Sequence, residues 1–400
     1  MKVLHVIPAI AARYGGPSTA VLQMCRALSA AGADVHLAAT NADGRGRLPQ
    51  SPDVWSTIDG VRTILFKRQW SEALKYSAPL AAWLRTSVAE YDAVHVHALL
   101  SHACLAAARA CRASGIPYVV RPLGTLDPWS LAQKPWRKRV LLAMGGRTAL
   151  SGAAAVHYTA AGEQRLVEAA FHTRGGFVLP LGIDAWFLEE EAVAQEEREQ
   201  RPYVLALSRL HPVKALDVLI DAFGDIHTDG SAWRLVIAGD GDEEYARGLR
   251  AQAAMSPAAS AIEFRGWVDG AEKRALLRGA SLYALPSHHE NFGVSLVEAL
   301  ACGVPAVVSS HVLVGNDLAA ANAAWVTAND RTSLASTLRA AMTDARLRSQ
   351  KSVAARRFAS ELAWPRVAAR LLEVYASLQA DASVSRRHAR LTSPPVTKGL

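Results

Sequence analysis

The stretch "HHENFGVSLVEALACGVPAVVSS", residues 288–310, places one carboxylate just before an apolar segment and a second one inside it. The run "LYALPS", 282–287, predicts a buried strand that ends in a loop, and "VSLVEALAC", 294–302, predicts a buried helix beyond that loop. The first amides of such a helix lack partners within the helix and attract anions. Glu290 lies in the loop and Glu298 about two turns further on, where its two oxygens suit a pair of neighbouring hydroxyls.

A single ligand that contacts both carboxylates is therefore one interpretation of this stretch. In the alternative, Glu290 only balances the helix dipole and Glu298 is a surface residue. The apolar neighbours of Glu298 count against that alternative, because a surface carboxylate seldom stands in an apolar helix.

Length and composition set the class of protein. Four hundred residues exceed one ordinary core and predict two domains, and 50% hydrophobic with 20% charged residues fits a soluble globular chain. The net charge of +8 suits anionic partners: phosphorylated small molecules, nucleic acid or an acidic membrane surface. The four cysteines form no Cys-x-x-Cys pair, so we expect free buried thiols in a reducing compartment.

No apolar run approaches the ~18 residues of a membrane span. The opening "MKVLHVIPAIAA", 1–12, resembles a weak signal peptide in composition. Its β-rich run, stopped by Pro8 and followed by a turn, predicts a first buried strand instead.

Short β-rich runs alternate with longer Ala/Leu-rich segments, which predicts an α/β fold with parallel sheets covered on both faces. The expected strands are 3–8, 35–40, 61–66, 93–97, 118–121, 155–159, 177–180, 203–208, 234–238, 262–265, 282–286, 305–309 and 324–327. The acidic run "EEEAVAQEEREQ", 189–200, interrupts this alternation and predicts a linker. Two such domains leave a cleft, and ligands bind at the carboxyl ends of their strands.

We expect an N-terminal Rossmann-like domain over 1–185, a linker over 186–202 and a second Rossmann-like domain over 203–357. Amphipathic helices over 358–380 follow, and the polar residues 381–400 are expected to be disordered.

Two cations follow the expected strand 203–208. Arg209 offers a planar fork and Lys214 a point charge, and together they suit a diphosphate. Taken alone, an ordinary solvated loop is the favoured interpretation of this segment. Gly15 and Gly16 follow the first strand, where a phosphate can approach the backbone closely. The segment lacks Gly-x-Gly-x-x-Gly, which disfavours a dinucleotide site and leaves a plain glycine turn as the alternative.

His95 and His97 share one face of the expected strand 93–97. We disfavour a metal site there because no third ligand is evident nearby. We expect His95 in the core and His97 facing the cleft.

The segment "ENFGVSLVEALACGVPAV", 290–307, resembles the Glu-x7-Glu signature of the family 4, group 1 retaining glycosyltransferases, and further segments match in order over 1–375. This resemblance implies the GT-B fold: two Rossmann-like parallel-sheet domains that face each other across a cleft, with a C-terminal helix that crosses back. It implies that Glu290 contacts the donor sugar and that Glu298 binds the nucleotide ribose.

The resemblance implies roles for further residues. The amides of Phe292, Gly293 and Val294 would hold sugar hydroxyls and phosphate, and Arg209 and Lys214 would stabilise the leaving nucleoside diphosphate. Gly15 and Gly16 would face the donor phosphates and the acceptor, and His97 would lie close to the reacting sugar. On the acceptor side it implies Arg121, Thr125 and Asp127.

Four other segments are interpreted with the resemblance. "GDGDEE", 239–244, contains Asp-x-Asp, a metal motif of another glycosyltransferase fold, but the family has a Gly-x-Gly turn there, so we expect no metal. "FRGWV", 264–268, resembles the nucleobase loop, and "LPLGID", 179–184, resembles the hinge between the domains. Tryptophans beside the basic residues 134–139 suit an anionic membrane surface about as well as a solvated helix.

The expected reaction is transfer of a sugar, with retention at the anomeric carbon, from a GDP- or UDP-sugar to a hydroxyl of a saccharide or polyprenyl-linked acceptor. No metal or other cofactor and no nucleic acid is expected to take part. The resemblance implies a role in cell-surface polysaccharide synthesis, in the cytoplasm or at the inner face of the membrane. The alternatives are a sugar-nucleotide epimerase, a glycogen-type phosphorylase and a two-lobed binder without chemistry; the first lacks an evident acid–base pair and the second a cofactor lysine.

Overall fold

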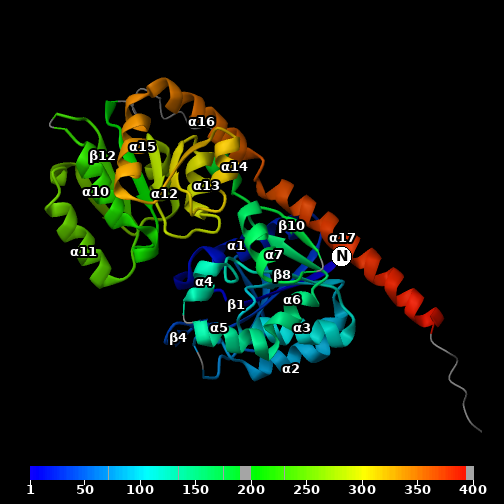
Figure 1. Cartoon of the computed structure of the whole chain (residues 1–400). Helices are drawn as coiled ribbons and strands as arrows, with labels where there is room; N and C mark the ends of the chain where they lie inside the picture. The colour runs from blue at the N-terminus through cyan, green and yellow to red at the C-terminus, as the bar shows by residue number, and fades with distance from the viewer. Residues whose placement is uncertain (71, 134, 174, 190–199, 229, 393–400) are drawn as a thin grey trace, which may run out of the picture. The chain divides into compact units, whose positions relative to one another are not determined.

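The computed structural model describes the chain except residues 71, 134, 174, 190–199, 229 and 393–400, and the side chains of 382–392. It divides into two compact units (Figure 1). Unit 1 comprises Met1–Thr159, Glu163–Gly182 and Trp364–Leu400, and unit 2 comprises Ala160–Gly162 and Ile183–Ala363.

Unit 1 is built on an eight-stranded sheet in the order β10-β9-β8-β7-β1-β2-β6-β5. Its strands are β1 (Lys2–Ala9), β2 (Asp34–Thr40), β5 (Trp55–Ile58), β6 (Val61–Phe66), β7 (Ala93–His97), β8 (Tyr118–Arg121), β9 (Ala155–Tyr158) and β10 (Gly176–Val178). All neighbours are parallel except β5 and β6, which form an antiparallel edge. The edge strand β5 and the small hairpin β3 (Ala42–Asp43) and β4 (Gly46–Arg47) are absent from the sequence prediction.

Helices connect these strands, as the alternation predicts. They are α1 (Gly16–Ala30), α2 (Ala78–Ser87), α3 (His102–Ser114), α4 (Pro128–Ala132), α5 (Pro135–Leu141), α6 (Arg147–Ser151), α7 (Ala161–Ala170) and α17 (Trp364–Thr392), with short turns η1 (Ala12–Tyr14), η2 (Val88–Glu90) and η3 (Leu142–Gly146). Local chemistry fixes their ends: the Ser101 hydroxyl accepts from the Cys104 amide at the start of α3, and Gly115, at φ +67°, ends that helix.

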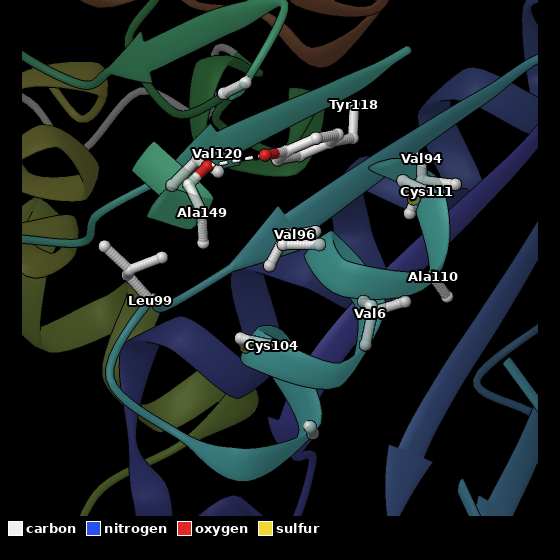
Figure 2. Close-up of a cluster of buried hydrophobic side chains, with 14 of the residues drawn as sticks. Val6, Val94, Val96, Leu99, Cys104, Ala110, Cys111, Tyr118, Val120 and Ala149 are labelled. Carbon is white, nitrogen blue, oxygen red and sulfur yellow. Dashed lines mark hydrogen bonds between the residues drawn. The ribbon is translucent and has the colours of Figure 1, made fainter. Parts of the chain in front are cut away.

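The two faces of this sheet differ because successive side chains on a strand point to opposite sides. Figure 2 shows the apolar face, where Val6, Val94, Val96 and Val120 pack with residues of α3. The Tyr118 hydroxyl, on the same face, donates to the Ala149 carbonyl at 2.7 Å. The intervening strand positions, on the other face, carry polar side chains, described below as the polar face: His5, His95, His97, Arg121 and His157.

Unit 2 has a six-stranded parallel sheet in the order β13-β12-β11-β14-β15-β16. Its strands are β11 (Tyr203–Leu207), β12 (Arg234–Ala238), β13 (Ile262–Gly266), β14 (Leu282–Leu285), β15 (Ala306–Ser309) and β16 (Ala324–Thr327). Its helices are α8 (Ala185–Leu188), α10 (Leu216–Ile226), α11 (Glu243–Ala254), α12 (Gly270–Gly279), α13 (Val294–Ala301), α14 (Gly315–Ala320), α15 (Arg331–Thr343) and α16 (Ala345–Ser360), with turns η4 (Pro212–Lys214) and η5 (Ala259–Ala261).

Strand order reverses once in each sheet. In unit 1 the chain builds outward from β1 through β2 and later returns to β7 on the other side of β1, and in unit 2 it builds outward from β11 and returns to β14. The loops that leave the two central strands at such a point diverge and leave a crevice at the carboxyl edge of the sheet. This geometry decides where a ligand can bind in each unit.

The chain passes from unit 1 to unit 2 between residues 182 and 183, three residues before the expected boundary. Of the expected linker, residues 190–199 lie outside the described residues, and 186–188 belong to α8. The last helix, α17, returns to unit 1 and runs to Thr392, so residues 381–392 are helical where we expected disorder. Among the described residues, no helix combines the length and apolar character that crossing a membrane requires.

Tyr375 fixes α17 to the polar face of the unit 1 sheet, because its buried hydroxyl lies 2.6 Å from His95 Nδ1. We predict that Tyr375→Phe lowers the free energy of unfolding by about 1–3 kcal/mol, the cost of leaving a buried polar atom unpaired. Glu373→Gln, at an exposed position on the same helix, serves as the control. Chemical denaturation measures both variants, and equal stability of Tyr375→Phe and wild type would contradict the prediction.

Candidate functional site

Two loops meet at the reversal point of the unit 2 sheet, one after β11 and one after β14. The backbone joins them, since the His288 amide donates to the Val213 carbonyl at 2.8 Å. The side chains join them as well, through an ion pair between Lys214 Nζ and Glu290 Oε2, both only 17% exposed. The structure therefore brings together a cation and a carboxylate that lie 76 positions apart in the sequence.

The helix α13 begins directly behind this ion pair. Gly293 precedes it at φ +77°, a conformation that favours glycine, and a Cβ there would lie 3.1 Å from Leu285 Cδ2. As the N-cap residue, Gly293 supplies no side-chain cap to α13, and the first amides of a helix have no partner inside it. The Ser295 hydroxyl donates to the Leu207 carbonyl at 2.8 Å and thereby holds this helix start against the end of β11.

Glu298 lies within α13 and is 6% exposed. Lys273, on α12, contacts both of its carboxylate oxygens, with Nζ 2.7 Å from Oε1 and 2.5 Å from Oε2. Burial raises the pKa of Glu298, and the charge of Lys273 opposes that rise. The surface position considered for Glu298 is therefore wrong, because its helix packs into the unit.

The glycine turn after β12 supports the loop that carries Arg209. A Cβ on Gly239 would lie 1.9 Å from the Ser208 carbonyl oxygen, and one on Gly241 would lie 2.1 Å from that of Leu210. The Asp240 side chain accepts from the Gly241 amide, and Asp242 caps α11. Residues 239–242 thus form the loop before α11, which begins at Glu243, and exposed Arg209 lies on the loop packed against it.

In unit 1, Gly15 and Gly16 connect η1 to α1 at the carboxyl end of β1. Gly15 adopts φ +77°, which favours glycine, and both residues are exposed. They lie beside the reversal point between β1 and β7, where the sequence placed them.

His97 departs from the expectation that it faces a cleft. It is fully buried, with Nε2 2.9 Å from His5 Nδ1 and Nδ1 3.4 Å from Arg121 Nη1. Its side chain lies on the polar face of the sheet, where the neighbouring strand β1 places the His5 imidazole at hydrogen-bonding distance. Burial, together with the charge of Arg121, holds the pKa of His97 well below its ordinary value.

The buried histidines continue along the polar face. His95 Nε2 lies 3.3 Å from His157 Nδ1, and His157 Nε2 lies 2.7 Å from the Leu179 carbonyl oxygen. The ligand nitrogens of His5, His95 and His97 lie within 4.8 Å of one another, so a third imidazole exists where the sequence revealed none. The guanidinium of Arg121 is buried in the same cluster, and its positive charge opposes a metal cation there.

The three residues assigned to the acceptor side have different surroundings. Arg121 is 1% exposed, and its burial lowers its pKa to about 10. The Thr125 hydroxyl donates to the Pro122 carbonyl at 2.6 Å, and Asp127 accepts from the Ser130 amide at the start of α4. Thr125 and Asp127 thus shape the loop after β8, which also holds buried Glu163 through the Gly124 amide.

Sequence reasoning missed Lys273, His5 and His157. Lys273 lies in a polar helix with no motif around it. The positions of the two histidines could have been predicted from the sequence. Each lies in a strand between two apolar residues, and those neighbours point to the opposite face of the sheet.

Family models match both halves of the chain. Residues 15–182 match the family model "Glycosyl transferase 4-like domain", and residues 188–358 match "Glycosyl transferases group 1". The chain belongs to the family 4, group 1 glycosyltransferases. It is 28% identical over 386 residues to a phosphatidyl-myo-inositol mannosyltransferase of Mycobacterium leprae, which covers 92% of this chain and 95% of the relative.

Solved structures show that this glycosyltransferase has the GT-B fold. Anabaena HepE in complex with UDP superposes with a TM-score of 0.75 at 20% identity, over 94% of this chain and all of that chain. WaaG, described as a glycosyltransferase of lipopolysaccharide biosynthesis, superposes with a TM-score of 0.70 at 18% identity, over 93% of this chain and 99% of that chain.

The buried histidines predict acid sensitivity. Burial lowers the pKa of His5 and of His157 to about 3, and those of His95 and His97 also fall well below 6.5. Below pH 6.5 the unfolded chain therefore binds protons that the folded enzyme does not, and stability falls as the pH falls. Each histidine contributes a loss of about 1.4 kcal/mol at pH 5.5 relative to neutral pH.

We predict that His157→Gln makes the pH dependence of unfolding shallower between pH 7 and 5.5. The exposed His172 provides the control, because its replacement by Gln leaves the dependence unchanged. Denaturation curves across this pH range measure both variants; equal slopes for His157→Gln and wild type would contradict the prediction.

Proposed function

We propose that this glycosyltransferase moves a sugar from a GDP- or UDP-sugar to a hydroxyl of a saccharide or polyprenyl-linked acceptor, with retention at the anomeric carbon. The observation that carries the proposal is the arrangement at the unit 2 reversal point. Lys214, Glu290 and the uncapped start of α13 meet there, and Glu298 lies further along the same helix.

Each group has a chemical task in this proposal. Lys214 and Arg209 balance the charge of the diphosphate, and the first amides of α13 donate hydrogen bonds to it. Glu290 accepts hydrogen bonds from the donor sugar, and Glu298 accepts them from the ribose. Glu290 and Lys214 form an ion pair with each other, and in this proposal the donor competes with that contact.

The proposed step breaks the bond between the anomeric carbon and the diphosphate oxygen, and the electron pair leaves with that oxygen. The acceptor hydroxyl oxygen attacks from the same face, and its proton passes to the departing phosphate. The step needs charge stabilisation above all, which preorganised cations and amides supply without reorganisation. No metal or cofactor takes part in this proposal.

Donor hydrolysis provides the test of the function. We expect the protein, incubated with UDP- or GDP-sugars labelled in the sugar, to release unaltered sugar slowly when no acceptor is present. Conversion to a different nucleotide sugar would identify an epimerase instead, and binding without turnover would identify a binder.

Lys214→Ala tests the assignment of the leaving-group cation. We predict a fall in turnover of about 10²–10³-fold, because a preorganised charge at the departing oxygen is lost. Arg247→Ala, which removes an exposed cation on α11, is the control and leaves turnover unchanged. Near-normal transfer by folded Lys214→Ala would refute this role.

On the acceptor side we propose the carboxyl edge of the unit 1 sheet, with Gly15, Gly16 and the loop that follows Arg121. Fully buried His97 supports this edge of the sheet through its contacts with His5 and Arg121. The mannosyltransferase relative is named for a lipid acceptor, which supports a lipid-linked acceptor here.

We propose that this glycosyltransferase works in the cytoplasm, at the inner face of the membrane, in cell-surface polysaccharide synthesis. The segment of α4 and α5 supports membrane contact, because Trp136 is 65% exposed beside exposed Arg137 and Arg139. Lys138 instead donates to the Ser130 hydroxyl at 2.8 Å, and Lys134 of the basic run lies outside the described residues. Exposed tryptophan and arginine side chains together favour contact with anionic lipid headgroups.

We predict that the protein sediments with vesicles of phosphatidylglycerol and phosphatidylcholine at low salt, and that Trp136→Ala sediments less. Trp267→Ala removes an equally exposed tryptophan, at 67%, from unit 2 and leaves sedimentation unchanged. Failure of the wild-type protein to sediment at low salt would count against membrane contact.

A further inference from the structure

The sequence analysis assigned no role to Lys273, yet this residue makes the shortest polar contacts of the Glu298 side chain. Its ammonium lies 2.7 Å from Oε1 and 2.5 Å from Oε2, and the Glu298 side chain is only 8% exposed against 25% for that of Lys273. A carboxylate so deeply buried needs a cation close by to remain ionised.

The other groups around Glu298 do not supply that charge. Asp184, which precedes α8, adds negative charge, and buried Tyr283 on β14 is neutral at physiological pH because burial raises its pKa. The face of the Phe187 ring, on α8, lies 5.7 Å from Lys273 Nζ and carries no net charge. Among the described residues, Lys273 is the cation that opposes the rise in the pKa of Glu298.

We propose that Lys273 is a positioning residue for donor binding, which keeps Glu298 ionised and holds its two oxygens where a pair of ribose hydroxyls can donate to them. The proposal rests on the proposed function, because it assumes that Glu298 meets the ribose. A carboxylate offers about four acceptor positions, so two remain free while Lys273 occupies the others. A protonated Glu298 loses acceptor capacity, and one of its oxygens becomes a donor.

The proposal predicts a pH signature. Removal of Lys273 takes away the charge that favours the ionised form, so the pKa of Glu298 rises further and a smaller fraction of its carboxylate is ionised at a given pH. Ribonucleotide affinity is then reduced, and it recovers as the pH rises and Glu298 ionises. A nucleotide without the 2′-hydroxyl cannot use both oxygens, so its affinity depends less on Lys273.

Titration calorimetry on the full chain, with UDP, GDP and their 2′-deoxy forms between pH 6 and 8.5, tests the proposal. We expect Lys273→Met to bind the ribonucleotide about 10-fold more weakly at pH 7, the usual effect of losing a hydrogen bond to a charged group, and to recover as the pH rises to 8.5. We expect Lys273→Arg to retain most of the affinity, and Lys273→Met with Glu298→Gln to show no recovery. Glu272→Gln, an exposed neighbour on α12, is the matched control and binds as wild type.

Equal weakening of ribo- and 2′-deoxynucleotide binding by Lys273→Met at every pH would overturn the proposal, because that result indicates structural damage alone. Unchanged affinity of Lys273→Met would overturn it as well. A wild-type protein that binds the ribo- and 2′-deoxy forms equally would instead overturn the ribose role of Glu298, on which the proposal rests.

Discussion

Parallel strands force the chain to return to the same edge of the sheet after every strand, and this constraint governs both units. Each connection crosses over a face, so all carboxyl ends of the strands lie along one edge. Where the strand order reverses, between β11 and β14 in unit 2 and between β1 and β7 in unit 1, neighbouring loops diverge. Short segments with unlike chemistry, such as those carrying Lys214 and Glu290, are thereby brought into contact.

The candidate site of unit 2 contains two ion pairs at different depths. The pair of Lys214 and Glu290 is partly exposed and lies in front of α13, whereas the pair of Lys273 and Glu298 is more deeply buried. The first joins two loops of one crevice, so a charged ligand competes with it directly. The second lies between α12 and α13, where the charge of Lys273 opposes the rise in pKa that burial gives Glu298.

Unit 1 gathers its buried polar groups on one face of the sheet. Four histidines and Arg121 lie there, while the opposite face packs apolar side chains against α3 (Figure 2). The histidines stay neutral because burial and the guanidinium both disfavour a further positive charge. Tyr375 joins this face to α17, because its hydroxyl lies within hydrogen-bonding distance of His95. The last helix of the chain therefore adds a polar group to this face.

The sequence by itself determined the two α/β units and nearly every strand, because apolar periodicity is a local property. Through its family resemblance it also singled out Lys214 and Glu290, which the structure pairs, and Arg209 and Glu298. It missed the antiparallel edge strand β5, which is short and only partly buried. It also predicted disorder from residue 381 onward, where α17 continues to Thr392. Only the tertiary structure decided that His97 is buried against His5 and that Lys273 contacts Glu298. These contacts join side chains from distant segments of the sequence. Burial and charge pairing depend on which residues the folded chain places side by side, and a local sequence pattern does not contain that information.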